Sequence, residues 1–304
     1  MIVRTPGAFT EALSTFRDLQ NTVPVPRGVF MVLPESFRVA DESAVDNPYL
    51  DLDHPADAGQ ALIQAHTLAD RVRACGVEVK LFPGLAETPD AIFPNNVFAT
   101  AAGRLLIGSM RHPGRRLEAQ RRDIRDWFSA QGYQAIDLSV RDCVSELTGP
   151  MIIDRARRIG FCGMSERIDE AGLAATHEGL GLNLSFAFDL VQGEYHTNVV
   201  MSILAGRACI LCPQSFADQR VPQAIAAAFP GRYLEITVAE KNAFAANCIA
   251  LTDQDLFISQ RGADALHPER IRTLESWGFR LHAVELSEIE KAGGSLRCMI
   301  AEIF

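Results

Sequence analysis

Five glycines at nearly regular spacing constrain the fold of this chain more than any other feature. Each one follows a segment with helical periodicity and precedes a short apolar run, and they are Gly76, Gly132, Gly181, Gly231 and Gly278. The steps between them are 56, 49, 50 and 47 residues. A glycine placed after a helix commonly ends it, because glycine adopts left-handed dihedral angles without a steric penalty. The spacing therefore predicts five similar units of about 50 residues each.

The segments around these glycines have the same expected order: strand, strand, helix, strand. Alternating hydrophobicity predicts the strands, and apolar residues at helical spacing predict the helices. The expected hairpin-like strand pairs are 97–108, 151–163, 198–212 and 247–259, the helices are 57–75, 115–131, 169–180, 219–229 and 268–277, and the strands after the glycines are 77–82, 133–138, 182–190, 233–238 and 279–286. Units at a fixed period favour an array or propeller of α/β units over a doubly wound sheet. With no linker-like tract, we expect one domain, residues 1–304.

The composition argues against several classes of protein. A formal charge of −9 disfavours general nucleic-acid binding, which needs a basic surface. No apolar run approaches the roughly 18 residues that span a bilayer, and the N-terminus lacks the pattern of an export signal. Seven cysteines, an odd number, fit reduced thiols better than a disulfide framework. We therefore expect a cytoplasmic protein with no nucleic-acid or membrane partner.

Two local patterns favour structural roles over functional ones. The arginine-rich stretch 111–125 contains interleaved acids and apolar residues at helical spacing, so we expect a solvated helix face there. Cys209 and Cys212 form a C-x-x-C pair, but the second pair that a zinc site of this kind needs is absent. Because their neighbours are apolar, we expect both cysteines to be buried in a strand.

A short polar segment follows the last strand of each unit. These segments are Pro89-Asp90, Ser145-Glu146, Tyr195-His196, Lys241-Asn242 and the stretch that ends at Cys298. Similar units deliver similar loops to one end of a repeat protein. Four of the five loops carry, in order, a carboxylate, a second carboxylate, an imidazole and a thiol. This pattern predicts an active site on a pseudo-symmetry axis.

Six short motifs in register give the chain a family resemblance. They are Thr88-Pro89-Asp90-Ala91-Ile92-Phe93-Pro94-Asn95-Asn96, Glu146-Leu147-Thr148-Gly149, Gly163-Met164-Ser165-Glu166-Arg167, Tyr195-His196-Thr197-Asn198, Ala245-Ala246-Asn247-Cys248 and Gly294-Ser295-Leu296-Arg297-Cys298. The chain resembles the guanidine-modifying enzymes from about residue 33 to residue 298. That superfamily includes arginine deiminases, dimethylarginine dimethylaminohydrolases, amidinotransferases and arginine dihydrolases. The resemblance implies the pentein fold, a five-bladed α/β propeller with pseudo-fivefold symmetry, which agrees with the five units counted above.

The resemblance also implies three catalytic residues. Cys298 matches the nucleophile, which forms a covalent intermediate and so divides a difficult bond cleavage into two easier steps. His196 matches the general acid and base, and Glu146 matches the carboxylate that orients it. Leu147-Thr148-Gly149 stands where the family more often has a diglycine, so the match at Glu146 is open to a shift of one residue. Composition alone would favour a buried terminal cysteine, while the structural alternatives to the other two roles are a polar histidine at a strand start and a surface acid.

Four further residues match substrate-binding positions. Asp90 matches the carboxylate that receives the polar end of the substrate, with a turn-forming aspartate as the structural alternative. Arg167 matches the arginine that binds the substrate α-carboxylate, because a planar guanidinium suits a bidentate acceptor. Arg111 is a second candidate for that role or a surface residue. Asn47 resembles an asparagine of the arginine dihydrolases on a long early connection, 34–55, or it starts an Asn-Pro turn.

Asn96 departs from the deiminase pattern, in which an acid faces the cationic guanidinium. An amide has no charge, and a charge pair at 4 Å is worth roughly 4 kcal/mol at an effective dielectric of about 20. Asparagine can accept one hydrogen bond and donate another, which suits a neutral ureido group such as that of citrulline. The arginine dihydrolases, which the chain resembles in having asparagine here, carry the reaction past citrulline to ornithine.

The leading hypothesis is a cysteine hydrolase of a citrulline- or arginine-like amino acid. For citrulline the products would be ornithine, ammonia and carbon dioxide. The alternatives are an arginine dihydrolase, a dimethylarginine dimethylaminohydrolase, an arginine deiminase and an amidinotransferase. A non-catalytic pentein-fold binding module, such as one that binds a ribosomal subunit, is the alternative outside the enzymes. The chemistry calls for no metal or organic cofactor, the expected partner is a small amino acid, and a homodimer is left open.

Overall fold

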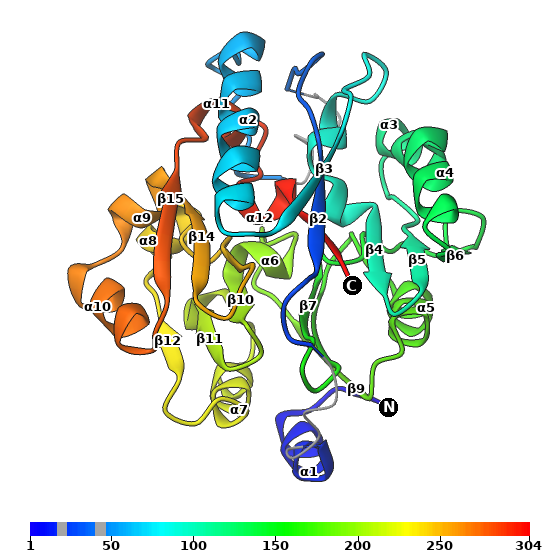
Figure 1. Cartoon of the computed structure of the whole chain (residues 1–304). Coiled ribbons are helices and arrows are strands. Elements are labelled where there is room, and N and C mark those ends of the chain that lie inside the picture. Colours follow the sequence, from blue (N-terminus) through cyan, green and yellow to red (C-terminus); the bar gives the residue numbers. More distant parts are fainter. Residues whose placement is uncertain (17–22, 40–46) are drawn as a thin grey trace.

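The computed structural model describes residues 1–16, 23–39 and 47–304 and contains five small sheets (Figure 1). Four sheets have three strands each and the fifth has four. In every sheet an antiparallel strand pair is extended by a third, parallel strand. A parallel neighbour requires a crossover connection, and a helix supplies it in each unit. This confirms the expected order of strand, strand, helix, strand.

The five units are made of the following elements. The first sheet has β16 (Ala301–Ile303), β2 (Gly28–Val32) and β3 (Glu78–Phe82) with helix α2 (Ala58–Ala74). The second has β4 (Phe98–Ala101), β5 (Arg104–Ile107) and β6 (Gln134–Asp137) with α3 (Pro113–Arg116) and α4 (Arg122–Ala130). The third has β1 (Ile2–Val3), β9 (Leu184–Asp189), β8 (Ile159–Met164) and β7 (Met151–Asp154) with α5 (Glu170–Leu180). The fourth has β10 (Met201–Leu204), β11 (Ala208–Leu211) and β12 (Tyr233–Glu235) with α7 (Arg220–Ala227). The fifth has β13 (Ile249–Ala250), β14 (Asp255–Ser259) and β15 (Arg280–Val284) with α9 (Gln260–Ala265) and α10 (Pro268–Ser276).

Four of the five repeat glycines stand directly at the end of their helix as predicted, whereas Gly231 follows four residues after the end of α7. All five have positive φ angles, which are 81°, 82°, 64°, 73° and 85° from Gly76 to Gly278. Gly181, for example, caps α5 in the left-handed conformation, and its amide donates to the backbone at the end of that helix. A residue with a β-carbon would be strained at these positions, so the glycines fix where each helix turns into its strand.

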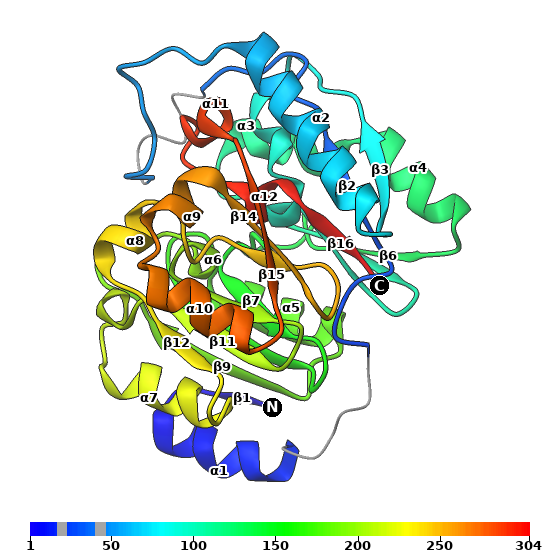
Figure 2. The same ribbon diagram turned by 60° about the vertical axis from the view of Figure 1, so that its left-hand side comes forward.

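The last strand of the chain completes the first sheet. β16 pairs antiparallel with β2, with Ala301 opposite Phe30, while β2 pairs in parallel with β3. First strands of different sheets also contact one another: β16 contacts β4, β7 contacts β10, and β10 contacts β13. The termini of the repeat are thus joined within one sheet, and the arrangement is consistent with a closed five-bladed propeller. Helices α2, α4, α7 and α10 lie on the outside of the molecule (Figure 2). That residues 1–304 form one domain stays a prediction.

Besides residues 198–200, which were expected in a strand but belong to a helix (Thr197–Val200), two parts of the chain differ from the prediction. The first is the expected helix 115–131, which is divided into α3, a short 3-10 turn (Glu118–Gln120) and α4. Arg121 breaks it, with φ −57° and ψ 100°. Arg115, Glu118 and Arg121 are buried, so the solvated helix face expected over 111–125 is wrong at those positions. The second is the N-terminal α1 (Pro6–Phe16), which packs against α7 and has no counterpart in the predicted repeat.

The cysteines behave largely as predicted. All seven are free, and Cys209 and Cys212 are both buried, one within β11 and one directly after it. Among the residues that the structure describes, no helix has the length and apolar character needed to cross a membrane. Short helices complete the fold near the site: α6 (Thr197–Val200), α8 (Val238–Asn242), α11 (Ser287–Glu290) and α12 (Leu296–Met299).

Candidate active site

A single cavity collects residues from segments that are far apart in the chain. Asp90 and Asn96 come from two 3-10 turns, Pro89–Ile92 and Pro94–Asn96, His196 precedes α6, and Cys298 lies in α12. The residues lining the cavity are Asn47, Asp90, Phe93, Asn96, Arg115, Arg167, Tyr195, His196, Ala292, Gly294 and Cys298. The predicted thiol, imidazole and first carboxylate are therefore brought together. Of the five predicted loops, those at Glu146 and Lys241 do not line this cavity.

His196 is bound to Glu146 directly behind the cavity wall. The imidazole Nε2 lies 2.9 Å from Glu146 Oε2, and both side chains are buried. An ionised carboxylate can only accept, so Nε2 carries the proton of this bond. Nδ1 is buried, and no residue that the structure describes forms a hydrogen bond with it. In the neutral ring Nδ1 is therefore an available proton acceptor.

Local backbone conformation places Glu146 and His196 together. Leu147, which follows Glu146, has φ 43°, a left-handed conformation that glycine adopts more easily. Its side chain is fully buried in the apolar cluster between the second and third sheets, which offsets that strain. A β-carbon on Gly149 would come within 2.7 Å of the His196 ring. The motif therefore works with one glycine where the family more often has two, and Glu146 keeps the predicted contact with the histidine.

Two arginines hold Glu146 in its ionised form. Arg167 Nη1 donates to both carboxylate oxygens, at 3.1 and 3.0 Å, and Arg115 Nη1 lies 3.8 Å from Oε2. Burial alone would raise the pKa of Glu146, but Arg167, His196 and Arg115 together lower it well below its usual range. Arg167 lines the cavity while its guanidinium is bonded to Glu146 and lies 5.3 Å from the centre of the Tyr195 ring. Its role in binding a substrate carboxylate stays a prediction.

Two asparagine amides surround the sulfur of Cys298. Nδ2 of Asn247 lies 3.4 Å from Sγ, and Nδ2 of Asn198 lies 3.7 Å from it. The backbone of Arg297 donates to Asn247 Oδ1 at 3.0 Å, which fixes the orientation of that amide. Both asparagines belong to motifs quoted above, but the sequence assigned them no role. Amide donors at this distance favour a sulfur that becomes negatively charged.

Burial controls the protonation of the thiol and the imidazole before substrate binds. It raises the pKa of the Cys298 thiol, and it lowers the pKa of His196 to about 4 against the opposing effect of Glu146. At neutral pH the pair is thus a neutral thiol and a neutral ring rather than a thiolate and an imidazolium. The nucleophile therefore has to be activated during the reaction.

This protonation state predicts the pH dependence of alkylation at Cys298. Because the thiol pKa is raised, the thiolate fraction and the rate should keep rising with pH beyond about 8.5, the ordinary thiol pKa. The measurement is the rate of Cys298 carbamidomethylation by iodoacetamide between pH 6 and pH 10, followed by peptide mass spectrometry, with Cys143 as the internal reference. A plateau already reached near pH 7 would contradict the prediction, since it would reveal a preformed thiolate.

Asp90 and Asn96 lie in the two successive 3-10 turns of one motif. Both side chains are buried, at 6 % and 4 % exposure. No residue that the structure describes bonds to the amide oxygen of Asn96. A buried polar atom without a partner is costly, and a substrate nitrogen that donates to it would remove that cost. Asn96 thus offers the cavity a neutral acceptor.

Asn47 reaches the cavity and also forms the turn that was its structural alternative. Its Oδ1 accepts from the Tyr49 amide at 3.0 Å, while Nδ2 donates to the Gly293 carbonyl at 3.2 Å. A β-carbon on Gly293 would come within 2.4 Å of Asn47, so glycine is required for this approach. Tyr195 OH donates to the same carbonyl at 2.7 Å. Residues 40–46 of the connection 34–55 lie outside the described residues.

Arg115 is a charged cavity residue that sequence reasoning missed, and Phe93, Tyr195, Ala292 and Gly294 also line the cavity without a predicted role. Arg115 was assigned to a solvated helix face, yet it is 5 % exposed and forms a bidentate pair with Glu118, with N–O distances of 3.0 and 2.9 Å. Burial raises the pKa of Glu118 to about 7, although Arg115 opposes this. The available signal was the Pro113-Gly114 pair, which interrupts helical periodicity. Arg111 is not brought to the cavity, since it forms an ion pair with Glu166 near the surface.

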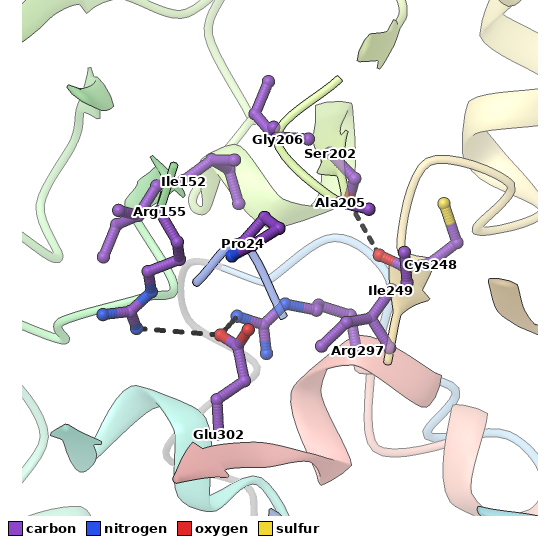
Figure 3. Close-up of a pocket in the computed structure, with 13 residues that line it drawn as sticks. Pro24, Ile152, Arg155, Ser202, Ala205, Gly206, Cys248, Ile249, Arg297 and Glu302 are labelled. Atoms are coloured by element: carbon purple, nitrogen blue, oxygen red, sulfur yellow. Dashed lines mark hydrogen bonds and ion pairs between the residues drawn. The ribbon is translucent and has the colours of Figure 1, made fainter. Parts of the chain in front are cut away.

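A second pocket lies next to the site but has different chemistry. Its wall includes Arg297, the neighbour of Cys298, together with Arg155, Glu302 and apolar residues of β7, β10 and β13. Figure 3 shows Glu302 between the two arginines, and its carboxylate accepts from Arg297 at 2.8 Å and lies 3.8 Å from Arg155. This pocket contains none of the predicted catalytic groups.

Comparison with known proteins places the chain in a family. Residues 33–304 match the family model described as N,N dimethylarginine dimethylhydrolase, eukaryotic. The chain belongs to the dimethylarginine dimethylaminohydrolase family. It is therefore a member of a family of hydrolases, and the resemblance to guanidine-modifying enzymes is confirmed.

Relatives of this family and their structures agree with the fold. The chain is 27 % identical over 281 residues to an N(G),N(G)-dimethylarginine dimethylaminohydrolase of Mycobacterium tuberculosis, covering 92 % of this chain and 87 % of that protein. It is 24 % identical over 223 residues to the bifunctional arginine dihydrolase/ornithine cyclodeaminase AgrE of Nostoc sp., covering 71 % of this chain but 30 % of AgrE.

The crystal structure of the N-terminal domain of ArgZ, a cyanobacterial arginine dihydrolase, matches with a TM-score of 0.79 at 19 % identity over 90 % of this chain and 97 % of that one. The dimethylarginine dimethylaminohydrolase of Pseudomonas aeruginosa matches with a TM-score of 0.69 at 18 % identity over 92 % and 100 %. The predicted pentein-type α/β fold is thereby confirmed.

Proposed function

We propose that this protein hydrolyses the ureido or guanidino carbon–nitrogen bond of a citrulline- or arginine-like amino acid, with Cys298 as the nucleophile. His196 is the general acid and base, and Glu146 orients it. The observation that supports this most is the convergence of the Cys298 thiol, the His196 ring and Asp90 in the wall of one cavity. In the bound pair of His196 and Glu146, the free Nδ1 is the nitrogen that serves the reaction.

The first step forms a bond between Cys298 Sγ and the planar substrate carbon. As sulfur attacks, Nδ1 of His196 takes the thiol proton, which suits a ring that is neutral beforehand. Nδ1 then gives this proton to the departing nitrogen, the carbon–nitrogen bond breaks, and an amine or ammonia leaves. Glu146 stabilises the imidazolium that exists between these two transfers. The amides of Asn198 and Asn247 stabilise negative charge on the sulfur.

The second step removes the covalent adduct with water. His196 Nδ1 takes a proton from the water as its oxygen attacks the carbon, and the carbon–sulfur bond then breaks. The proton returns to the sulfur, which restores the thiol. With a ureido substrate the product is a carbamic acid, which decomposes to carbon dioxide and an amine, so citrulline would yield ornithine, ammonia and carbon dioxide.

Asn96 supports a neutral ureido group as the preferred reacting end. Its amide oxygen is a buried acceptor for a substrate N–H, and its amide nitrogen can donate to a carbonyl oxygen. Asp90 provides the buried carboxylate for the substrate α-amino group or a terminal nitrogen. We infer citrulline as the substrate, with an arginine dihydrolase as the second candidate, because Asp90 could equally face a guanidinium.

A substrate panel tests the proposed function. Purified protein is incubated with citrulline, arginine and N,N-dimethylarginine, and ornithine, citrulline, ammonia and dimethylamine are quantified. Ornithine from citrulline but not from arginine supports the leading proposal, whereas ornithine from both supports the dihydrolase. Citrulline and dimethylamine from N,N-dimethylarginine would show that the neutral amide does not select against a cation. Turnover of none of the three substrates would overturn the proposed function.

The substitution Asn96→Asp tests the preference for a neutral group. The new carboxylate should raise kcat/KM for arginine relative to citrulline by about 10- to 1000-fold, the upper end corresponding to roughly 4 kcal/mol. Both substrates are assayed with each variant. Asn95→Asp is the matched control, because Asn95 is equally buried in the same turn but does not line the cavity. An equal change in both variants would contradict a specific role of Asn96.

A further inference from the structure

Three potential metal ligands meet on the outer part of the fold, apart from the cavity. Cys75 ends α2 in the first unit, Asp255 begins β14 and His282 lies in β15 of the fifth unit. None of the three lines the catalytic cavity. Helix α2 contacts β15, so this cluster lies where two neighbouring units of the propeller meet (Figures 1 and 2).

The register of the fifth sheet brings the aspartate and the histidine to one face. Asp255 is the partner of Arg280 in the parallel ladder, and His282 follows Arg280 by two residues. Residues two apart in a strand point to the same face of the sheet. The side chains of Asp255, Arg280 and His282 therefore share the face that lies against the end of α2. Asp255 Oδ1 lies 2.8 Å from His282 Nε2, and Cys75 Sγ lies 3.8 Å from the same nitrogen. The three ligand atoms lie within 4.8 Å of one another.

The separation between sulfur and nitrogen fits a tetrahedral ion that binds both atoms, and Asp255 moves away from His282 by about half an ångström to join them. Zinc bonds of about 2.3 Å to sulfur and about 2.0 Å to nitrogen place the two atoms roughly 3.6 Å apart in a tetrahedron. The observed 3.8 Å requires little movement of Cys75 or His282. A thiolate, an imidazole and a carboxylate together select zinc over magnesium or calcium, which prefer oxygen ligands alone. A fourth position is left for water.

The surrounding side chains hold the ligands in place. Thr252 Oγ1 donates to Asp255 Oδ2 at 2.6 Å, and the His282 ring stacks on Phe257 at 4.8 Å with an interplanar angle of 16°. Such supporting contacts fix the ring and the carboxylate before an ion arrives. Arg280 also bonds to Asp255, but its side chain is 67 % exposed and can move outward when a cation binds. The His282 side chain is 27 % exposed, which gives an ion access from solvent.

We propose that Cys75, Asp255 and His282 form a zinc-binding site that ties α2 to the neighbouring sheet. Binding exchanges the thiol proton of Cys75 for the metal and breaks the direct contact between Asp255 and His282. The thiol proton goes to solvent and the His282 ring carries its proton on Nδ1 instead of Nε2, so affinity increases with pH. The ion joins the first and fifth units and takes no part in the reaction at Cys298.

Metal binding is measured in the Cys298→Ser background, which removes the catalytic thiol as a competing ligand. Zn²⁺ affinity is determined by competition with a chromophoric chelator, and Co²⁺ binding is followed by its thiolate charge-transfer band. We expect one ion per chain, the charge-transfer band, and a Tm that rises by a few degrees at about 100-fold excess over Kd. Adding either Cys75→Ser or His282→Asn should weaken Zn²⁺ binding at least about 100-fold. Cys75→Ser should also abolish the thiolate charge-transfer band of Co²⁺.

Cys143→Ser is the matched control, because Cys143 is the other partly exposed cysteine and does not belong to the cluster. It should bind zinc like its parent. The proposal is overturned if Cys298→Ser alone abolishes binding, which would place the ion in the catalytic cavity. It is equally overturned if Cys75→Ser and His282→Asn both retain the parent's affinity, or if Cys143→Ser loses it. The His282→Asn variant keeps the test decisive if Cys75→Ser unfolds.

Discussion

Replacing Cys298 with serine is expected to lower kcat at least about 10³-fold while leaving the fold intact. Serine keeps the shape of the side chain but replaces sulfur with a far weaker nucleophile. Nothing else in the cavity wall supplies a thiol, since Cys298 is the cysteine among the residues that line it. The measurement is ammonia release under saturating substrate, together with a thermal unfolding curve of each variant.

The control for this substitution is Cys143→Ser, which makes the same chemical change at a partly exposed position away from the cavity. It should keep the parent's kcat within about twofold, because surface substitutions of this kind have small effects. The covalent intermediate gives a second readout: brief incubation with substrate and acid quenching should leave an adduct on Cys298 in the parent and none in Cys298→Ser. Normal turnover of the serine variant would remove the basis for the proposed mechanism.

The repeat pattern predicted the fold because its signal is local. Each of the five glycines stands between a helix and the next strand in a backbone conformation that few other residues adopt readily, so the unit boundaries can be recognised from single positions. The closure of the first sheet by β16 has no such signal. It depends on a pairing between Ala301 and Phe30, more than 250 residues apart. Long-range pairing of this kind leaves only an apolar strand pattern in each partner.

The site residues that lie in family motifs could be predicted from the sequence. Buried charged residues outside those motifs could not, because charged side chains usually lie on the surface. Cys298, His196 and Asp90 came from motifs in register, and the cavity contains all three. Arg115 and Glu118 looked like solvent-exposed charges, because hydrophobic periodicity treats every charge as polar surface. Their burial is possible because each satisfies the other, and that information exists only in three dimensions.

Breaking this buried pair should produce the largest loss of stability. Arg115→Met removes the guanidinium and leaves the Glu118 carboxylate, 2 % exposed, without its bidentate partner. Removal of one member of such a pair typically costs about 3–5 kcal/mol of unfolding free energy. Glu146 also loses one of its two neighbouring arginines, so the positioning of His196 should suffer as well. Chemical denaturation at several pH values measures the loss.

The pH dependence of that loss has a definite sign. Glu118 already has a raised pKa of about 7, and Arg115 is the group that lowers it, so the pKa rises further in Arg115→Met. A carboxyl whose pKa is higher in the folded state than its unfolded value of about 4.3 stabilises the fold at low pH and loses that contribution as pH rises. The destabilisation of Arg115→Met relative to the parent should therefore grow above about pH 7, where Glu118 ionises in the folded parent but stays protonated in the folded variant. A loss that shrinks over this range would contradict a buried, unpaired Glu118.

The double variant Arg115→Met/Glu118→Met separates stability from function. Replacing both members of a buried ion pair with apolar residues of similar size is often neutral or stabilising, so the double variant should recover most of the loss and its pH dependence. Activity should not recover with it, because Arg115 lines the cavity and faces Glu146 whereas Glu118 does not line it. Recovered stability with low kcat/KM would assign Arg115 to the site itself. If activity returned together with stability, Arg115 would serve only to hold the turn between α3 and α4, and the cavity would act on its substrate without it.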